Sequence, residues 1–247
     1  MKTSQVSMAT NVLVVLAQLL WSMLQVVGKS FVMSKSRRQA ISSSATFLVV
    51  FFVIHGLGNL TAFISGDAFN RYGHKLHTFG GGYVIYAIEA YLAAAFVWHL
   101  ASGMLLTYGD KKLQLGSKFS WQKARLALSG VLFSVFVVVH VMTFRFGKWY
   151  TTTLDGAQVR DLWKLQKEVF ASKSVVAFYV CSVLVIASHL FWGWQKTVRK
   201  PQGLGALLPK ESQPLAEAIG NALTIVLTIV YLSLPLYTHW LVHRVEA

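Results

Sequence analysis

Four histidines occur in four consecutive apolar stretches of the chain, one in each stretch. They are His55, His99, His140 and His189, in the contexts VIHGL, VWHLA, VVHVM and ASHLF. Polar side chains inside apolar membrane segments are rare and usually functional, because they cost free energy in hydrocarbon. Neutral imidazole is also a common ligand of transition metals. The alternative is four separate buried histidines, each hydrogen-bonded to a neighbouring carbonyl.

The positions of these histidines along their stretches agree in pairs. Each lies 15 to 17 residues after a reference residue near the start of its helix, which corresponds to roughly 23–26 Å at 1.5 Å per residue. These reference residues are Arg38 for His55, Tyr83 for His99, Arg125 for His140 and Lys173 for His189. Because successive helices run in opposite directions, His55 and His140 are expected at one depth. His99 and His189 are expected at the other depth. Four separate structural roles would also have to explain this shared placement.

Two histidines on separate helices have the chemistry needed to bind one haem b from opposite faces. Zinc needs three or four ligands at one point, and two pairs at two depths do not supply them. The sequence therefore predicts two bis-histidine haems stacked across a membrane. Such haems carry electrons, and their filled coordination leaves no open position for oxygen chemistry.

The composition is that of an integral membrane protein. Of the 247 residues, 55% are hydrophobic and 13% are charged, whereas soluble domains carry about 25% charge. Six stretches are long and apolar enough to span a membrane, at about 6–28, 44–64, 83–107, 125–146, 174–197 and 219–243. We predict an all-α integral membrane fold with two parts. Residues 1–43 form an N-terminal transmembrane helix with a basic loop, and residues 44–247 form a five-helix haem-binding bundle.

The net charge of +14 is spread between the apolar stretches. Nucleic acid is therefore not an expected partner, because the cations do not gather on one amphipathic face. Loops on one side of the predicted bundle hold 13 Lys and Arg against three acids, and the other side holds 10 against five. The positive-inside rule places the first set of loops inside and both termini outside.

Residues 40–243 resemble a known family. The segments that carry the resemblance are FLVVFFVIHGLGNLTAFISGDAFNRYGH, YAIEAYLAAAFVWHLASGMLLT, LSGVLFSVFVVVHVMTFRFG, WKLQKEVFASKSVVAFYVCSVLVIASHLFWGW and LSLPLYTHWL. They are similar to the single-chain, di-haem cytochrome b subunit of succinate:quinone oxidoreductases. This is the type B membrane anchor of complex II and of the related fumarate reductases.

The resemblance implies a pairing and a set of partners. It assigns His55 and His140 to a distal haem, and His99 and His189 to a proximal haem. It implies an iron–sulfur subunit bound on the inside, which carries a flavoprotein subunit with FAD where succinate is oxidised. Electrons would reach quinone through the two haems b. Ala187 stands where some menaquinone-linked relatives carry a glutamate, so proton transfer by that route is not expected.

Further candidates lie near the predicted helix ends. Cations and hydroxyls suited to haem propionates are Ser43 with its neighbours Ser42 and Ser44, Arg125 and Arg145. Titratable groups suited to an outer quinone site are Asp67, His74 and His77 in the loop before residue 83, and Glu89. A quinone site inside, near the iron–sulfur partner, is the alternative. Interfacial snorkelling or solvated loop positions would also explain these residues.

The expected location is an energy-transducing inner membrane, in contact with lipid. No acid precedes Asp67, which favours a mitochondrial inner membrane, while the mostly bacterial family makes a bacterial plasma membrane the alternative. The predicted N-terminal helix is additional to the family's five, and either bundle packing or contact with an additional membrane subunit would explain it. The rival functions are a cytochrome b subunit of another quinone-linked dehydrogenase and a haem-free membrane anchor or transporter.

Overall fold

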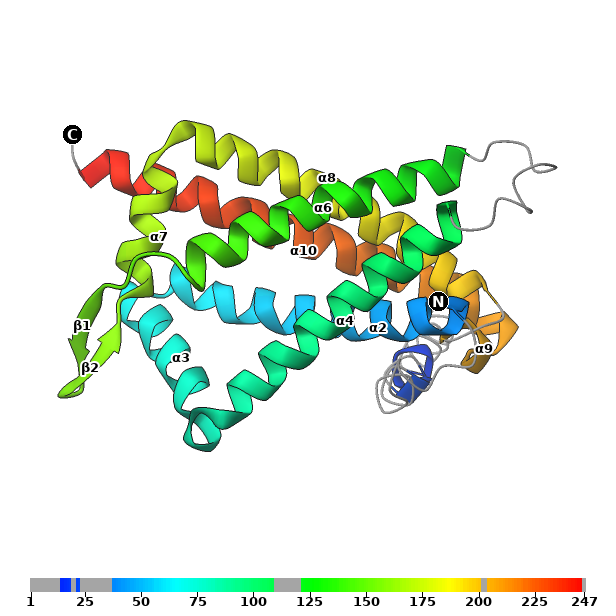
Figure 1. Ribbon diagram of the computed structural model, residues 1–247, viewed down its shortest axis with the longest axis horizontal. Helices are drawn as coiled ribbons and strands as arrows, with labels where there is room; N and C mark the ends of the chain where they lie inside the picture. Colours follow the sequence, from blue (N-terminus) through cyan, green and yellow to red (C-terminus); the bar gives the residue numbers. More distant parts are fainter. Residues whose placement is uncertain (1–13, 19–20, 23–36, 109–120, 201–203, 246–247) are drawn as a thin grey trace, which may run out of the picture. The chain divides into compact units, whose positions relative to one another are not determined.

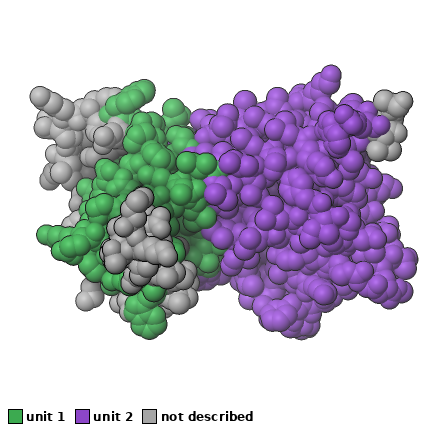
Figure 2. All heavy atoms as spheres, turned by 180° about the vertical axis from the view of Figure 1, so that it is seen from behind, with its two compact units in different colours: residues 1–50, 94–128, 188–225 green, residues 51–93, 129–187, 226–247 purple. Residues whose placement is uncertain are grey.

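The structure is a computed structural model that describes residues 14–18, 21–22, 37–108, 121–200 and 204–245. It divides into two compact units, drawn in different colours in Figure 2. Unit 1 comprises residues 1–50, 94–128 and 188–225, and unit 2 comprises residues 51–93, 129–187 and 226–247. The five long helices each contribute residues to both units. The predicted boundary between residues 1–43 and residues 44–247 falls inside the first of these helices, and it stays a prediction. The predicted orientation in the membrane, with both termini outside, also stays a prediction.

Five described helices are long and apolar enough to cross a membrane (Figure 1). They are α2 (Arg37–Asn59), α4 (Tyr83–Tyr108), α6 (Trp121–Phe144), α8 (Lys173–Arg199) and α10 (Gln213–Val245). A short 3-10 turn, η2 (Leu60–Phe63), follows α2. Helices satisfy every backbone polar group within the segment, which hydrocarbon requires. The predicted all-α membrane bundle is confirmed for these five helices.

The predicted N-terminal helix at 6–28 lies largely outside the described residues. Residues 14–18 and 21–22 are described, and they are helical. Val15 is buried in a cluster with Trp194 and Leu204 in unit 1. The side-chain oxygen of Gln18 accepts a hydrogen bond from the Ser212 hydroxyl at 2.9 Å. The described part of this segment therefore packs against the rest of unit 1.

Unit 1 has its core around Trp194 of α8. The indole Nε1 donates to the backbone carbonyl of Ala216 at 3.1 Å, and Val198 and Leu204 are fully buried beside it. Two short elements, α9 (Leu204–Leu207) and η4 (Lys210–Ser212), connect α8 to α10. These contacts join α8, α9 and α10 into one apolar cluster.

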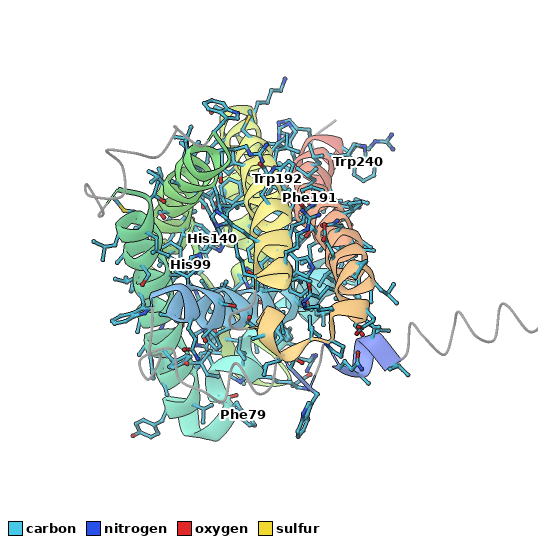
Figure 3. The ribbon with its side chains drawn as sticks, turned by 90° about the vertical axis from the view of Figure 1, so that its right-hand side faces the viewer. Phe79, His99, His140, Phe191, Trp192 and Trp240 are labelled. Carbon is cyan, nitrogen blue, oxygen red and sulfur yellow. The ribbon has the colours of Figure 1, made fainter. Side chains whose placement is uncertain are left out.

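The segment 66–78 of unit 2 is a helix, α3 (Gly66–Thr78), so the expectation of a loop there was wrong. The Ser65 hydroxyl caps it by accepting from the Ala68 amide at 3.0 Å. Asp67 in the first turn and Lys75 in the last turn both favour the helix dipole. The 3-10 turn η3 (Phe79–Gly82) follows, and its three glycines all have positive φ. Phe79 is exposed at this turn (Figure 3).

A β-hairpin and a second short helix complete unit 2 (Figure 1). Strands β1 (Thr151–Leu154) and β2 (Ala157–Arg160) are antiparallel. Asp155 and Gly156 between them both have positive φ, as a two-residue type I′ turn requires. Helix α7 (Leu162–Ala171) follows directly, capped by the Asp161 carboxylate, which accepts from the Lys164 amide at 2.9 Å.

Asn70 of α3 ties these elements together in unit 2. Its side-chain nitrogen donates to Asp161 at 2.9 Å, and its side-chain oxygen accepts from the Trp163 amide at 2.9 Å. Asn70 is buried, so both halves of its amide are satisfied within protein. Farther along α7, the buried Gln166 donates to the Thr238 hydroxyl of α10 at 2.8 Å.

Candidate functional site

Unit 2 brings together His55 of α2 and His140 of α6. Their ring centroids are 5.9 Å apart and their planes cross at 86°. Each imidazole stacks on a phenylalanine one helical turn earlier: Phe51 at 5.4 Å from His55, and Phe136 at 5.5 Å from His140. These rings fix the directions in which the two imidazoles point. Nδ1 of His140 is buried and has no hydrogen-bond partner among the described residues.

Unit 1 brings together His99 of α4 and His189 of α8 in the same manner. Their ring centroids are 6.3 Å apart and their planes cross at 80°. The Ser44 hydroxyl lies 3.1 Å from Nδ1 of His99, and the backbone carbonyl of Leu126 accepts a hydrogen bond from His189. Each imidazole of this pair is thereby oriented by a hydrogen bond from outside the pair.

Both spacings fit a single metal ion held between two imidazoles. A bond from histidine nitrogen to a metal is about 2 Å long, and the ring centre lies about 1 Å farther, so opposite ligands have ring centres about 6 Å apart. The observed 5.9 and 6.3 Å agree with this value. Each pair could therefore hold one metal ion between its two rings. All four histidines are half-buried residues.

The glycines beside the histidines differ between the two units. In unit 1, Gly103 and Gly193 each lie four residues after a histidine, and a Cβ built on either would meet nothing within 4 Å. This open surface on the histidine side of α4 and α8 suits a flat ligand. In unit 2, a Cβ at Gly56 would lie 3.3 Å from the Tyr231 hydroxyl, and one at Gly58 would lie 2.5 Å from the Tyr72 ring. These two glycines therefore serve close packing.

Arg125 of α6 is the strongest candidate for a propionate partner in unit 1. Its guanidinium lies 3.7 Å from the centre of the Trp192 ring, and Trp192 is three residues after His189 on α8 (Figure 3). The Arg125 Nε is buried without a hydrogen-bond partner among the described residues. A buried guanidinium donor that lacks an acceptor fits a carboxylate.

Ser42, Ser43 and Ser44 all lie inside α2 and are buried. The Ser42 hydroxyl accepts from the Leu204 amide at 3.3 Å. The serine that contacts a histidine is Ser44, whereas no contact of Ser43 with the described residues supports its predicted role. Ser44 also donates to the carbonyl of Ala40 at 2.8 Å, which fixes the position of its oxygen.

Arg145 and Glu89 of unit 2 were predicted as separate candidates, but they form an ion pair. Two contacts join them, at 2.8 and 3.0 Å. The hydrogen bond that Arg145 donates to the Glu89 carboxylate raises the pKa of the Arg145 guanidinium, which is therefore charged at any working pH. A propionate or quinone at either residue would have to compete with this pair.

The remaining quinone candidates lie on α3. His74 and His77 are half-buried near its end, and His77 interacts electrostatically with Glu89 and Arg145. Asp67 is exposed in the first turn of the same helix, about 15 Å along the axis from His77. The structure therefore gathers His74, His77 and Glu89, and it leaves Asp67 apart.

No protein-family model, curated protein or solved structure matches this chain. The resemblance to the complex II anchors therefore stays a prediction, and the side-chain geometry has to support any function. Among the described residues, no group of three or more His, Cys, Asp and Glu side chains lies close enough to hold one metal ion.

Three residues near the histidine pairs were missed as functional candidates or undervalued. Ser44 was grouped with Ser42 and Ser43, although adjacent residues of a helix point in different directions, so that Ser44 and Ser43 cannot both face His99. Trp192 follows His189 by three residues, a helical spacing that places both on neighbouring surface. Tyr179 lies ten residues before His189 on α8, but its ring contacts His140, with centroids 6.2 Å apart. No sequence pattern indicates that contact between helices.

Proposed function

We propose that this chain is the membrane-anchor cytochrome b subunit of a succinate:quinone oxidoreductase. The observation that supports this most strongly is the pair of matched histidine arrangements. Two bis-histidine sites occur in one helical membrane protein, with ring centres 5.9 and 6.3 Å apart. When bound, two haems b would supply one-electron carriers between a dehydrogenase and quinone.

The chain's own residues would hold and tune these groups. His55 and His140 would hold one haem in unit 2, and His99 and His189 would hold the other in unit 1. Ser44 and the Leu126 carbonyl hold the unit 1 imidazoles in fixed tautomers. Arg125 would offset the negative charge of a propionate.

The resemblance extends this proposal to partners and location. The partners would be an iron–sulfur subunit and a FAD flavoprotein, and the location would be an inner mitochondrial or bacterial plasma membrane. Neighbouring membrane subunits are a further class of partner. Five apolar helices support a multi-pass membrane protein in contact with lipid.

Purification of the native complex tests the proposal. We expect it to contain a covalent-flavin protein and an iron–sulfur protein together with this chain, and we expect succinate to reduce its haem absorption bands. A complex with haem but a different dehydrogenase would indicate a cytochrome b subunit of another quinone-linked enzyme. A chain without haem would favour a haem-free anchor or a transporter.

A further inference from the structure

Two further histidines, His239 and His243, lie one helical turn apart near the end of α10. Both belong to unit 2, and their ring centroids are 4.2 Å apart, with the ring planes at 46°. Residues four apart share one face of a helix, and two histidines at this spacing can bind one metal ion together. Neither residue belongs to the two histidine pairs described above.

Hydrogen bonds fix the tautomer of both rings. Nδ1 of His239 donates to the backbone carbonyl of Phe170 at 2.8 Å, and Nδ1 of His243 donates to the backbone carbonyl of His239 at 2.9 Å. A carbonyl oxygen can only accept, so each neutral ring must carry its proton on Nδ1 and keep a lone pair on Nε2. Neither Nε2 has a hydrogen-bond partner among the described residues. Metal-ligating histidines are commonly oriented in this way by backbone carbonyls.

A structural role explains His239 better than it explains His243. The Phe170 carbonyl belongs to the last turn of α7, whose carbonyls lack a partner within that helix. His239 supplies one and thereby joins α10 to α7. His243 is exposed, and its hydrogen bond stays within α10, so it joins no second element. A metal site would account for both residues.

The distance between the two rings favours a particular class of metal ion. With ring centres about 3 Å from the ion, ligands at right angles place them about 4.2 Å apart, and tetrahedral ligands place them about 4.9 Å apart. The observed 4.2 Å agrees with the first value. Right-angled nitrogen ligands suit Cu²⁺ and Ni²⁺, whereas Zn²⁺ prefers a tetrahedron.

The surroundings of the two histidines are open to water and to the membrane interface. Trp240 is 49% exposed (Figure 3), and the Arg244 guanidinium lies 4.6 Å from the centre of its ring. Aromatic and basic side chains of this kind are typical of the membrane–water interface. Arg244 is thereby held beside Trp240, on the helix face next to the two histidines. Within the described ranges no third His, Cys, Asp or Glu side chain completes a metal-binding group with them.

We propose that His239 and His243 form a surface site for an exchangeable divalent transition metal ion of the class that prefers right-angled ligands, Cu²⁺ or Ni²⁺. The two Nε2 atoms bind the ion, and water fills its other positions. A bound ion links two successive turns at the end of α10, beside the contact of that helix with α7. The argument does not depend on the proposed function, because neither haem nor quinone enters it.

Titration of the purified full-length chain with Cu²⁺ tests this site. The chain carries no polyhistidine tag and is kept in a non-ionic detergent, so that neither a tag nor anionic lipid binds the metal. Electron paramagnetic resonance counts the bound Cu²⁺, and electron spin echo modulation counts the imidazoles that ligate it. We expect a tightest site with two imidazoles, and weaker competition from Zn²⁺ than from Ni²⁺. Tighter binding of Zn²⁺ than of Cu²⁺ would overturn the assignment.

One substitution and a matched control locate the ion. His243→Asn removes an exposed ligand, and we expect it to abolish the two-imidazole signal and to weaken Cu²⁺ binding at least about tenfold, since loss of even an outer contact of a ligand costs about that much. The double variant His243→Asn/Arg244→His restores the number of histidines but places the second one on another face of the helix. It should not recover the signal.

Two results would refute the site. One is a two-imidazole Cu²⁺ signal that persists in His243→Asn, which would place the ion at other histidines. The other is full recovery of binding in the double variant, which would show that the spacing does not matter. Haem content of the same samples is an independent measurement: a chain without haem that binds Cu²⁺ through His243 would refute the proposed function and support this site.

Discussion

The Ser44 hydroxyl lies 3.1 Å from Nδ1 of His99, although 55 residues separate them along the chain. Ser44 is fully buried on α2, and its oxygen is fixed by contacts with the carbonyls of Ala40 and Ile41. This arrangement favours the tautomer with a proton on Nδ1 of His99. The Nε2 atom then keeps its lone pair for a metal.

We predict that Ser44→Ala weakens the haem site of unit 1. Loss of an outer hydrogen bond to a ligating histidine typically costs about 10- to 100-fold in metal affinity. The midpoint potential of that haem should also rise, because the imidazole becomes a weaker electron donor to iron. Redox titration and haem content per chain measure both effects. Ser43→Ala, at a neighbouring buried position, is the control, and an equal effect of both substitutions would contradict the role of Ser44.

Each of the four single histidine substitutions should remove one haem, and the two histidines of a pair should remove the same one. His55→Ala and His140→Ala should abolish one haem signal, and His99→Ala and His189→Ala should abolish the other, because each haem needs both of its axial ligands. Low-temperature absorption spectra resolve the two signals. If His55→Ala and His99→Ala removed the same signal, the pairing within units would be refuted.

Glycine substitutions separate ligand contact from helix packing. Gly103→Phe and Gly193→Phe should each displace the haem of unit 1, because these positions face open surface beside its histidines. Gly103→Ala should leave haem in place, since a Cβ there meets nothing within 4 Å. Gly58→Ala should destabilise the fold by about 1–3 kcal/mol, because its Cβ would overlap the Tyr72 ring. Haem content and thermal unfolding report the two effects, and retention of haem in Gly103→Phe would contradict the ligand-facing role.

Acid should loosen the attachment of residues 148–150 to α7. Hydrogen bonds from Lys148 first, and from Tyr150 second, lower the pKa of the Glu168 carboxyl. Because the pKa of Glu168 is lower in the folded state, the ionised carboxylate stabilises the fold, and this contribution is complete above the ordinary glutamate pKa of about 4.3. It is lost as the pH falls through the lower folded value.

Hydrogen exchange of residues 148–160, corrected for the intrinsic rate at each pH, measures this loss. Exchange should become faster below about pH 4 in the wild-type chain. Glu168→Gln should show the faster exchange at neutral pH and little further change on acidification. An equally steep pH response in this variant would show that another group is responsible.

Much of the membrane bundle could be predicted because its signals are local. An uncharged apolar run must form a helix in hydrocarbon, and the predicted stretch at 83–107 matches α4 at Tyr83–Tyr108. The histidine pairs could be predicted as well, because depth along a helix follows directly from residue number. Their function as haem ligands stays a prediction.

The elements outside the apolar stretches were missed although the sequence carries signals for them. Ser65 and Asp67 mark the start of α3, and the glycines from Gly80 onward mark its end. The Asp155-Gly156 dipeptide between short β-branched segments indicates the hairpin.

Contacts between side chains of different helices could not be predicted from the sequence. The Glu89–Arg145 pair and the Ser44–His99 contact depend on how each helix is rotated about its axis, which sequence spacing does not determine.

The most direct test of the account is a pyridine haemochrome assay on the purified complex, expressed per mole of this chain. The two histidine pairs predict two haems b per chain. A value of one would show that a pair has lost its ligand function, and the histidine variants would identify it. The absence of haem b would contradict the central claim and assign the four histidines a purely structural role.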